Sequence, residues 1–191
     1  MRIVGGRFRG ARLAAPGAAG GGAAHLRPTS DRTREAVFNM LAHGGHGDPP
    51  PPEGRRVLDL FAGTGALGLE ALSRGALRAV FVDDLARARA LIRQNVETLG
   101  VIAETKIWRR DATRLGPCRG APFDLVFADP PYHGDLGARA LDSARAGGWL
   151  APGALVVLET APEDPLPDGG WLEVLDRRRY GEAQVTIARV R

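Results

Sequence analysis

Cysteine is almost absent from this 191-residue chain, in which Cys118 stands alone. A single thiol forms no internal disulfide, and no group of cysteine and histidine residues has the spacing of a zinc site. No apolar run approaches the roughly 20 residues that a membrane-spanning helix requires, and the N-terminus lacks the apolar core of a signal peptide. We therefore expect a cytoplasmic protein with no metal and no membrane anchor.

Lysine is nearly absent as well, because Lys106 is the only lysine among 26 basic residues. Arginine favours bidentate contacts with phosphates and stacking on nucleobases, although heavy use of arginine also fits a biased genome composition. The first forty residues contain seven arginines and only two acids, so the net charge of +4 is concentrated there. This imbalance predicts an anionic partner at the N-terminal end, with a solvated basic surface as the alternative.

Three segments are expected along the chain. Residues 1–42 predict a short hairpin, an Ala/Gly-rich loop and a helix that is capped by Ser30 or Asp31. Residues 43–54 include four consecutive prolines and predict a stiff, extended linker. Residues 55–191 are predicted to form the catalytic domain.

The third segment alternates short apolar strands with helices of about a dozen residues, the pattern of a doubly wound α/β sheet. Strands are predicted at residues 57–60, 79–82, 104–108, 124–128 and 154–159, followed by an antiparallel hairpin over residues 171–190. A mostly parallel sheet that ends in such a hairpin matches the Rossmann-like, seven-stranded methyltransferase fold. The small basic N-terminal hairpin and helix would extend it.

The segment Asp129-Pro130-Pro131-Tyr132 follows one of these strands directly. Two prolines fix φ and remove two backbone donors, so the turn presents oxygen acceptors. The amine of a nucleobase is a poor nucleophile until its hydrogens are held, which Asp129 and the Pro130 carbonyl are placed to do. Tyr132 would stack on the base, a contact worth roughly 1–3 kcal/mol. The motif predicts amine methylation, and a proline-stiffened loop is the alternative.

A glycine-rich loop, Gly63-Thr64-Gly65-Ala66-Leu67-Gly68, lies between a predicted strand and helix, where a backbone approaches a nucleotide closely. Dinucleotides use the same loop. Asp83 has the spacing of an acid that binds ribose hydroxyls. Asp59, before the loop, suits a cationic methionyl group and would repel a pyrophosphate. Asp111 and Ala112 would read an adenine edge, unless Asp111 caps the following turn. The pattern favours S-adenosylmethionine.

These motifs resemble the RsmD-type bacterial methyltransferases, which modify guanine N2 in 16S ribosomal RNA. The resemblance covers nearly the whole chain and runs through Met1–Gly6, Arg27–Leu41, Asp59–Gly75, Asp129–Tyr132 and Tyr180-Gly181. The stretch from Arg27 to Leu41 is the most specific part. The motif at Asp129 is shared with adenine N6 and cytosine N4 methyltransferases, so it indicates the reaction and not the base.

The resemblance implies cofactor contacts from Asp59, Phe61, Ala62, Gly63, Thr64, Gly65, Asp83, Asp111 and Ala112, and target-amine contacts from Asp129, Pro130, Pro131 and Tyr132. Similar proteins often carry a second acid two positions after the ribose acid, where this chain has Leu85. The basic N-terminal segment is expected to hold phosphates of 16S ribosomal RNA, within the small subunit, through Arg7, Arg9, Arg27, Arg32 and Arg34. A monomer is expected.

Three other functions remain open at the level of sequence. An adenine N6 methyltransferase of DNA or RNA would use the same amine-holding motif. A catalytically silent RNA-binding module of the assembling ribosome is an alternative from another class. An NAD-dependent oxidoreductase would use the glycine-rich loop, but the chain has no evident residue for hydride transfer.

Overall fold

The computed structural model describes residues 1–16, 30–132 and 134–191. One seven-stranded sheet forms its centre, with strand order β3-β2-β1-β4-β5-β7-β6. The strands are β1 (Arg56–Leu60), β2 (Arg78–Val82), β3 (Thr105–Trp108), β4 (Phe123–Ala128), β5 (Leu150–Thr160), β6 (Leu172–Tyr180) and β7 (Ala183–Val190). Every predicted strand and the C-terminal hairpin are confirmed.

Strands β1 to β5 are parallel, whereas β7 runs antiparallel to both β5 and β6. The hairpin therefore inserts its second strand next to β5 and leaves β6 at the sheet edge. Strands β1, β2 and β4 are buried nearly throughout, as expected for parallel strands that are covered on both faces. The predicted Rossmann-like methyltransferase fold is confirmed.

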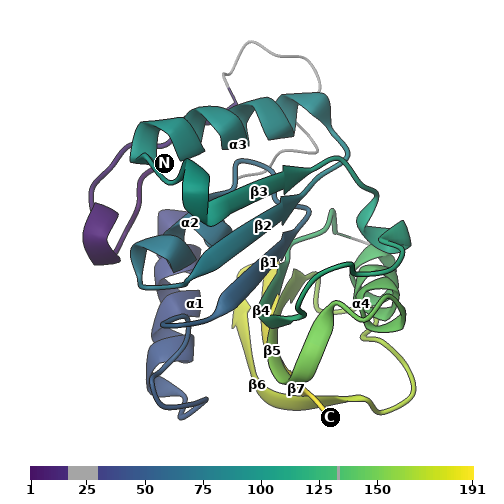
Figure 1. Cartoon of the computed structure of the whole chain (residues 1–191). Coiled ribbons are helices and arrows are strands. Elements are labelled where there is room, and N and C mark those ends of the chain that lie inside the picture. The colour runs from purple at the N-terminus through teal and green to yellow at the C-terminus, as the bar shows by residue number, and fades with distance from the viewer. Residues whose placement is uncertain (17–29, 133) are drawn as a thin grey trace.

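Helices cover both faces of the sheet (Figure 1). Helices α1 (Asp31–His43), α2 (Ala66–Ser73) and α3 (Ala86–Leu99) pack on one face, and α4 (Leu136–Ala146) packs on the other. Side chains of a strand alternate between the faces, so Val57 joins the first core and Leu58 joins the second. None of the helices in the described ranges has the length and apolarity that crossing a membrane requires.

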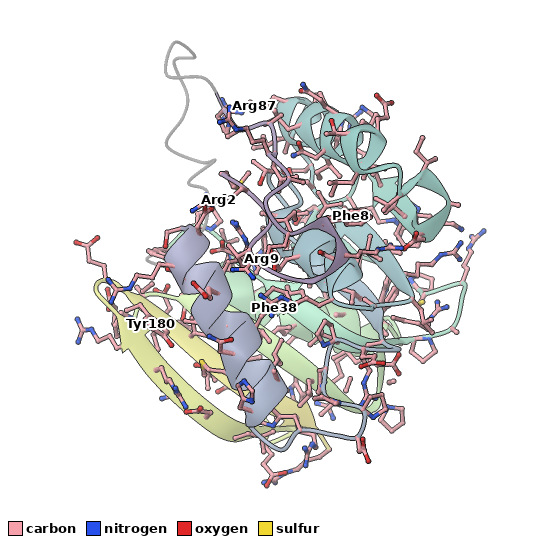
Figure 2. All side chains as sticks on the ribbon, turned by 90° about the vertical axis from the view of Figure 1, so that its left-hand side faces the viewer. Arg2, Phe8, Arg9, Phe38, Arg87 and Tyr180 are labelled. Carbon is pink, nitrogen blue, oxygen red and sulfur yellow. The ribbon has the colours of Figure 1, made fainter. Side chains whose placement is uncertain are left out.

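Helix α1 forms as its sequence predicts. The Ser30 side chain accepts a hydrogen bond of 3.0 Å from the Thr33 amide and caps the first turn. Val37, Met40 and Leu41 are buried. The helix crosses the C-terminal hairpin, with Tyr180 beside it and Arg2 near its first turn (Figure 2). The tertiary fold thus places this N-terminal helix over the last two strands.

The predicted N-terminal hairpin is present as a short antiparallel pairing around the bridge between Arg2 and Arg12, with a 3-10 turn at Gly6–Phe8. The Ile3 amide donates to the Ala11 carbonyl at 2.9 Å, and the Leu13 amide donates to the Met1 carbonyl at 3.2 Å. The amides of Val4 and Gly5 donate to Glu70 on α2, at 2.8 Å each. Most of the predicted Ala/Gly loop, together with Arg27, lies outside the described residues.

The proline-rich segment before β1 is not the extended linker that its composition predicts. It folds into turns, in which the Glu53 amide donates to the Pro50 carbonyl and the Arg55 amide to the Pro52 carbonyl. Pro51 and Pro52 are buried. The turns fold the segment back on itself, and its two buried prolines show that it packs against the rest of the molecule.

Candidate active site

The glycine-rich loop connects β1 to α2 at the carboxyl end of the sheet. Phe61 has φ of 57°, and it is the only residue other than glycine with positive φ in the described ranges. Gly63 and Gly65 follow with φ of 56° and 77°. Such conformations cost free energy for residues with a Cβ and persist at functional sites. The loop therefore turns sharply over the end of β1, with Phe61 and Gly63 partly exposed.

Gly68 allows α2 to lie directly on the sheet. A Cβ at this position would come within 2.5 Å of Phe81 Cε1 and 3.1 Å of Asp59 Oδ2. The Gly68 amide donates to that carboxylate oxygen at 3.0 Å, and Asp59 is only 2% exposed. Burial raises the pKa of Asp59 to about 8. Asp59 thus supports the loop from beneath, and its contact with the methionyl group stays a prediction.

Asp83, at the end of β2, holds the same loop from the side. Its Oδ2 accepts from the Gly63 amide and its Oδ1 from the Leu85 amide, both at 2.9 Å. Burial raises the pKa of Asp83, and these two backbone hydrogen bonds act in the opposite direction. A carboxylate has more acceptor sites than two amides occupy, so the predicted ribose contact remains compatible with this geometry.

Asp111 follows β3 and caps the short turn η4 (Ala112–Arg114). Its Oδ1 accepts from the Thr113 amide at 2.8 Å and from the Thr113 hydroxyl at 2.7 Å. These hydrogen bonds lower the pKa of the Asp111 carboxyl. Ala112 is buried. The structure shows the capping role that the sequence left open, and the adenine contact stays a prediction.

The Asp129-to-Tyr132 segment begins where β4 ends, next to the glycine-rich loop. The Asp129 amide lies 3.5 Å from the carbonyl oxygen of Leu60, the last residue of β1. Pro130 is buried, Pro131 is exposed, and both Asp129 and Tyr132 are partly exposed. The fold therefore brings the predicted methylation motif and the predicted cofactor loop together at adjacent strand ends.

Glu159 belongs to this site although the sequence analysis did not single it out. It lies near the carboxyl end of β5, is 8% exposed, and accepts a hydrogen bond from the Tyr132 hydroxyl. Ligands of open α/β sheets bind outside the carboxyl ends of the strands. The sequence signal that could have identified Glu159 is therefore an acid near the carboxyl end of a predicted parallel strand.

Three buried polar residues attach the N-terminal segment to α2 and to the cofactor loop. Glu70 receives two backbone amides of that segment and lies 2.8 Å from Arg74 Nε. The Ser73 hydroxyl accepts from the Phe8 amide at 3.0 Å. Asn95 connects the segment to the cofactor loop itself, through the carbonyl of Thr64. Because these partners are far apart in the sequence, no sequence pattern indicated them.

The prediction that Arg34 contacts RNA is wrong. Its side chain is fully buried, where it pairs with Asp31 at 2.8 Å and donates to the Arg2 carbonyl. Its Nε lies 3.8 Å from Glu70. The guanidinium therefore joins α1, α2 and the N-terminal segment.

The other predicted RNA contacts have different positions. Arg7 forms an ion pair with Glu104, which precedes β3 at the amino end of the sheet, so the structure does not bring it to the site. Arg9 lies on the same exposed turn (Figure 2). Arg32 is exposed on the first turn of α1, the end that Asp31 connects to the Arg2 amide.

Three further arginines, Arg177, Arg178 and Arg179, lie exposed on the edge strand β6. The register pairs Arg179 with Gln184 of β7, and Gln184 pairs with Thr160 of β5. Arg179 therefore lies level with the carboxyl ends of β4 and β5, although β5 and β7 separate its strand from β4. The antiparallel hairpin returns this arginine run to that end of the sheet, a result that the local sequence did not reveal.

The geometry fits S-adenosylmethionine. Two glycines with positive φ turn the loop backbone over the carboxyl end of β1, where nucleosides bind in open α/β sheets. Asp83 and Asp111 follow the neighbouring strands β2 and β3, and an acid at each end suits hydroxyl and amine donors. The methylation motif follows β4 on the other side of β1. A methyl donor and an acceptor amine would thus meet above β1.

Comparison with known proteins agrees with this geometry. Residues 1–189 match the family model described as conserved hypothetical protein 95. Ribosomal RNA small subunit methyltransferase D of Escherichia coli K12 is 39% identical over 168 residues, which cover 87% of this chain and 78% of that protein. The solved structure of E. coli yhhF aligns with a TM-score of 0.79 and 31% identity, over 100% of this chain and 97% of that one.

A more distant structure shares the fold. It is the 16S rRNA N2 G1207 methyltransferase RsmC of Thermus thermophilus, solved in complex with AdoMet and guanosine. It is 24% identical, with a TM-score of 0.63, and the match covers 85% of this chain and 44% of that one. The match over residues 1–189 and the 39% identical relative show that the chain belongs to the RsmD-type methyltransferase family, and S-adenosylmethionine is its cofactor.

Proposed function

We propose that this protein methylates the exocyclic N2 amine of a guanine in 16S ribosomal RNA, within the small ribosomal subunit. The observation that carries the proposal is the position of Asp129 and Tyr132 beside the cofactor loop, at the ends of adjacent strands β4 and β1. The name of the E. coli relative, a small subunit methyltransferase, and the guanosine bound by RsmC support the substrate. We expect the protein to act as a monomer in the cytoplasm.

S-adenosylmethionine, when bound, would supply an electrophilic methyl group. The N2 nitrogen would bond to the methyl carbon as the carbon–sulfur bond breaks and the sulfur leaves as a thioether. Asp129 and the Pro130 carbonyl hold the two amine hydrogens and draw the nitrogen toward tetrahedral geometry. The Asp129 carboxylate also stabilises the positive charge that develops on the amine. Asp129 or water then accepts the released proton. Tyr132 stacks on the base after its extrusion from the RNA, and most of the rate gain comes from positioning.

The RNA backbone would lie over basic side chains around the site. Arg2 and Arg32 are exposed near the first turn of α1, and Arg27 precedes that helix in the sequence. Arginine contacts to phosphate provide affinity and orientation without base specificity. The order of contacts we propose is therefore phosphate binding by these arginines, followed by entry of one base at Asp129.

The test is methyl transfer from radiolabelled S-adenosylmethionine to small ribosomal subunits and to DNA, followed by mass-mapping of the modified nucleotide. We expect label only in N2-methylguanine of the ribosomal RNA. Asp129→Ala should lower this rate at least about 100-fold, with RNA binding retained. Glu97→Ala, a change at an exposed acid on α3, is the control and should retain full activity. Label on adenine would reject the guanine assignment, and RNA binding without any label would favour the silent RNA-binding module.

A further inference from the structure

Asp129 and Glu159 occupy neighbouring positions on two parallel strands. Ala128 of β4 pairs with Leu158 of β5, so Asp129 and Glu159 are the next residues on the two strands. Strand neighbours lie about 4.8 Å apart, and the alternation of side chains directs both acids to the same face of the sheet. The fold therefore places the two acids at neighbouring positions at the carboxyl ends of β4 and β5.

Glu159 is buried although it carries a carboxylate. It is 8% exposed, and burying a carboxylate is unfavourable unless hydrogen-bond donors compensate. The Tyr132 hydroxyl supplies one donor, to Oε1. An ionised carboxylate accepts about four hydrogen bonds, so the contact with Tyr132 does not preclude a contact with a ligand. An acid held in this way next to the amine-binding motif is suited to contact the same base.

We infer that Glu159 accepts the N1–H of the target guanine while Asp129 holds the adjacent N2 amine. This assignment rests on the proposed guanine methylation and extends it to the choice of base. Guanine presents N1–H and N2–H as neighbouring donors, and two neighbouring carboxylates are complementary to them. Adenine presents its amine next to an N1 lone pair, which a carboxylate repels. Glu159 thus makes a site that is built for an exocyclic amine select guanine.

Tyr132 has a separate part in this arrangement. Its hydroxyl occupies Oε1 and orients the carboxylate of Glu159, while its ring is available to the base. Tyr132 is therefore a positioning residue for Glu159 and a stacking residue for the substrate. The two roles make different predictions for substitutions at residues 132 and 159.

The test uses small subunits reconstituted with 16S RNA that carries either guanine or 2-aminopurine at the methylated position, found first by mass-mapping. The base 2-aminopurine keeps the amine on C2 but has an N1 acceptor in place of N1–H. We expect wild-type protein to favour guanine over 2-aminopurine in kcat/KM by about 5- to 150-fold. In Glu159→Gln the amide can turn an N–H toward N1, so this preference should fall at least about tenfold, through slower guanine transfer and faster 2-aminopurine transfer.

Two further variants separate base reading from a structural role. Tyr132→Phe keeps the stacking ring and removes only the hydroxyl that orients Glu159, so it should lower the preference for guanine by less than Glu159→Gln does. Glu159→Asp, which retains the acid, should keep that preference at a reduced rate. An unchanged preference in Glu159→Gln, or the same loss of preference in Tyr132→Phe, would overturn the inference. So would a wild-type ratio near one, which needs no variant to fold. In all three cases guanine methylation by the wild type still stands, whereas label on another base would instead reject the proposed function.

Discussion

The side-chain amide of Asn95 donates a hydrogen bond of 2.9 Å to the carbonyl oxygen of Thr64. Asn95 is fully buried on α3, and Thr64 lies within the cofactor loop. The same amide group exchanges two hydrogen bonds with the backbone of Ala14, at 2.7 and 3.2 Å. One side chain thus joins the cofactor loop to the N-terminal segment, so the order of one depends on the order of the other.

Replacing Asn95 should weaken both the fold and the binding of the cofactor. Asn95→Ala leaves the Thr64 carbonyl and the backbone groups of Ala14 without their partner, and each unsatisfied buried group costs about 1–3 kcal/mol. We expect the free energy of unfolding to fall by about 2–4 kcal/mol in urea denaturation. Calorimetry should show weaker S-adenosylmethionine binding at temperatures where the variant is folded. Unchanged affinity in a destabilised variant would show that the loop does not depend on this contact.

A methyl group at Gly68 should destabilise the protein although it raises helix propensity. Gly68→Ala gains about 1 kcal/mol in intrinsic helix propensity, but its Cβ would lie 2.5 Å from Phe81 Cε1. Phe81 is fully buried, and overpacking a close-packed core typically costs about 1–3 kcal/mol. We expect a net loss of stability and a lower melting temperature. Gly120→Ala, at a position with nothing within 4 Å, is the matched control and should melt like the wild type.

Asp59 should make the protein less stable as the pH rises. Burial raises its pKa to about 8 in the folded chain, against about 3.9 for an unfolded aspartate. Between these values the folded state retains a proton that the unfolded state has released. The free energy of unfolding therefore falls with increasing pH, by up to about 1.4 kcal/mol per pH unit, until the pH passes the folded pKa.

Asp59→Asn removes the titrating carboxyl group and keeps an oxygen acceptor for the Gly68 amide. Urea denaturation between pH 5 and pH 8 should show a shallower decline for this variant than for the wild type. A smaller decline should remain, because burial also raises the pKa of Asp83. Glu97→Gln, at an exposed position, should follow the wild-type curve. Parallel curves for Asp59→Asn and the wild type would contradict the raised pKa.

The exposed arginines of β6 should contribute to RNA affinity. Arg177 and Arg179 lie near the end of β6 that is level with the carboxyl ends of β4 and β5. They are about three strand spacings, or roughly 14 Å, from β4. Replacing both by glutamine should weaken RNA binding and reduce the slope of log K against log salt by about 1–2. Filter binding over a salt series measures this slope. Arg119→Gln, at an exposed position before the amino end of β4, should leave it unchanged.

Local patterns in the sequence predicted most of the architecture. Apolar runs such as residues 57–60 and 79–82 are strands because only a sheet that is covered on both faces buries every side chain of such a run. Ser30 caps α1 because its hydroxyl is in reach of an amide three residues later. The prolines before β1 misled the prediction, since their composition does not encode the backbone hydrogen bonds that fold them into turns.

By itself the sequence determined where strands and helices follow one another along the chain, the glycine-rich loop and the Asp129 motif, because each depends on residues that are close together in the chain. Tertiary structure alone decided that Arg34 is buried beside Glu70, that Asn95 holds the cofactor loop, and that Glu159 meets Tyr132. These contacts join residues 27 to 36 positions apart. Their formation depends on which strands become neighbours and which face each side chain takes, and the packing of the whole sheet determines both.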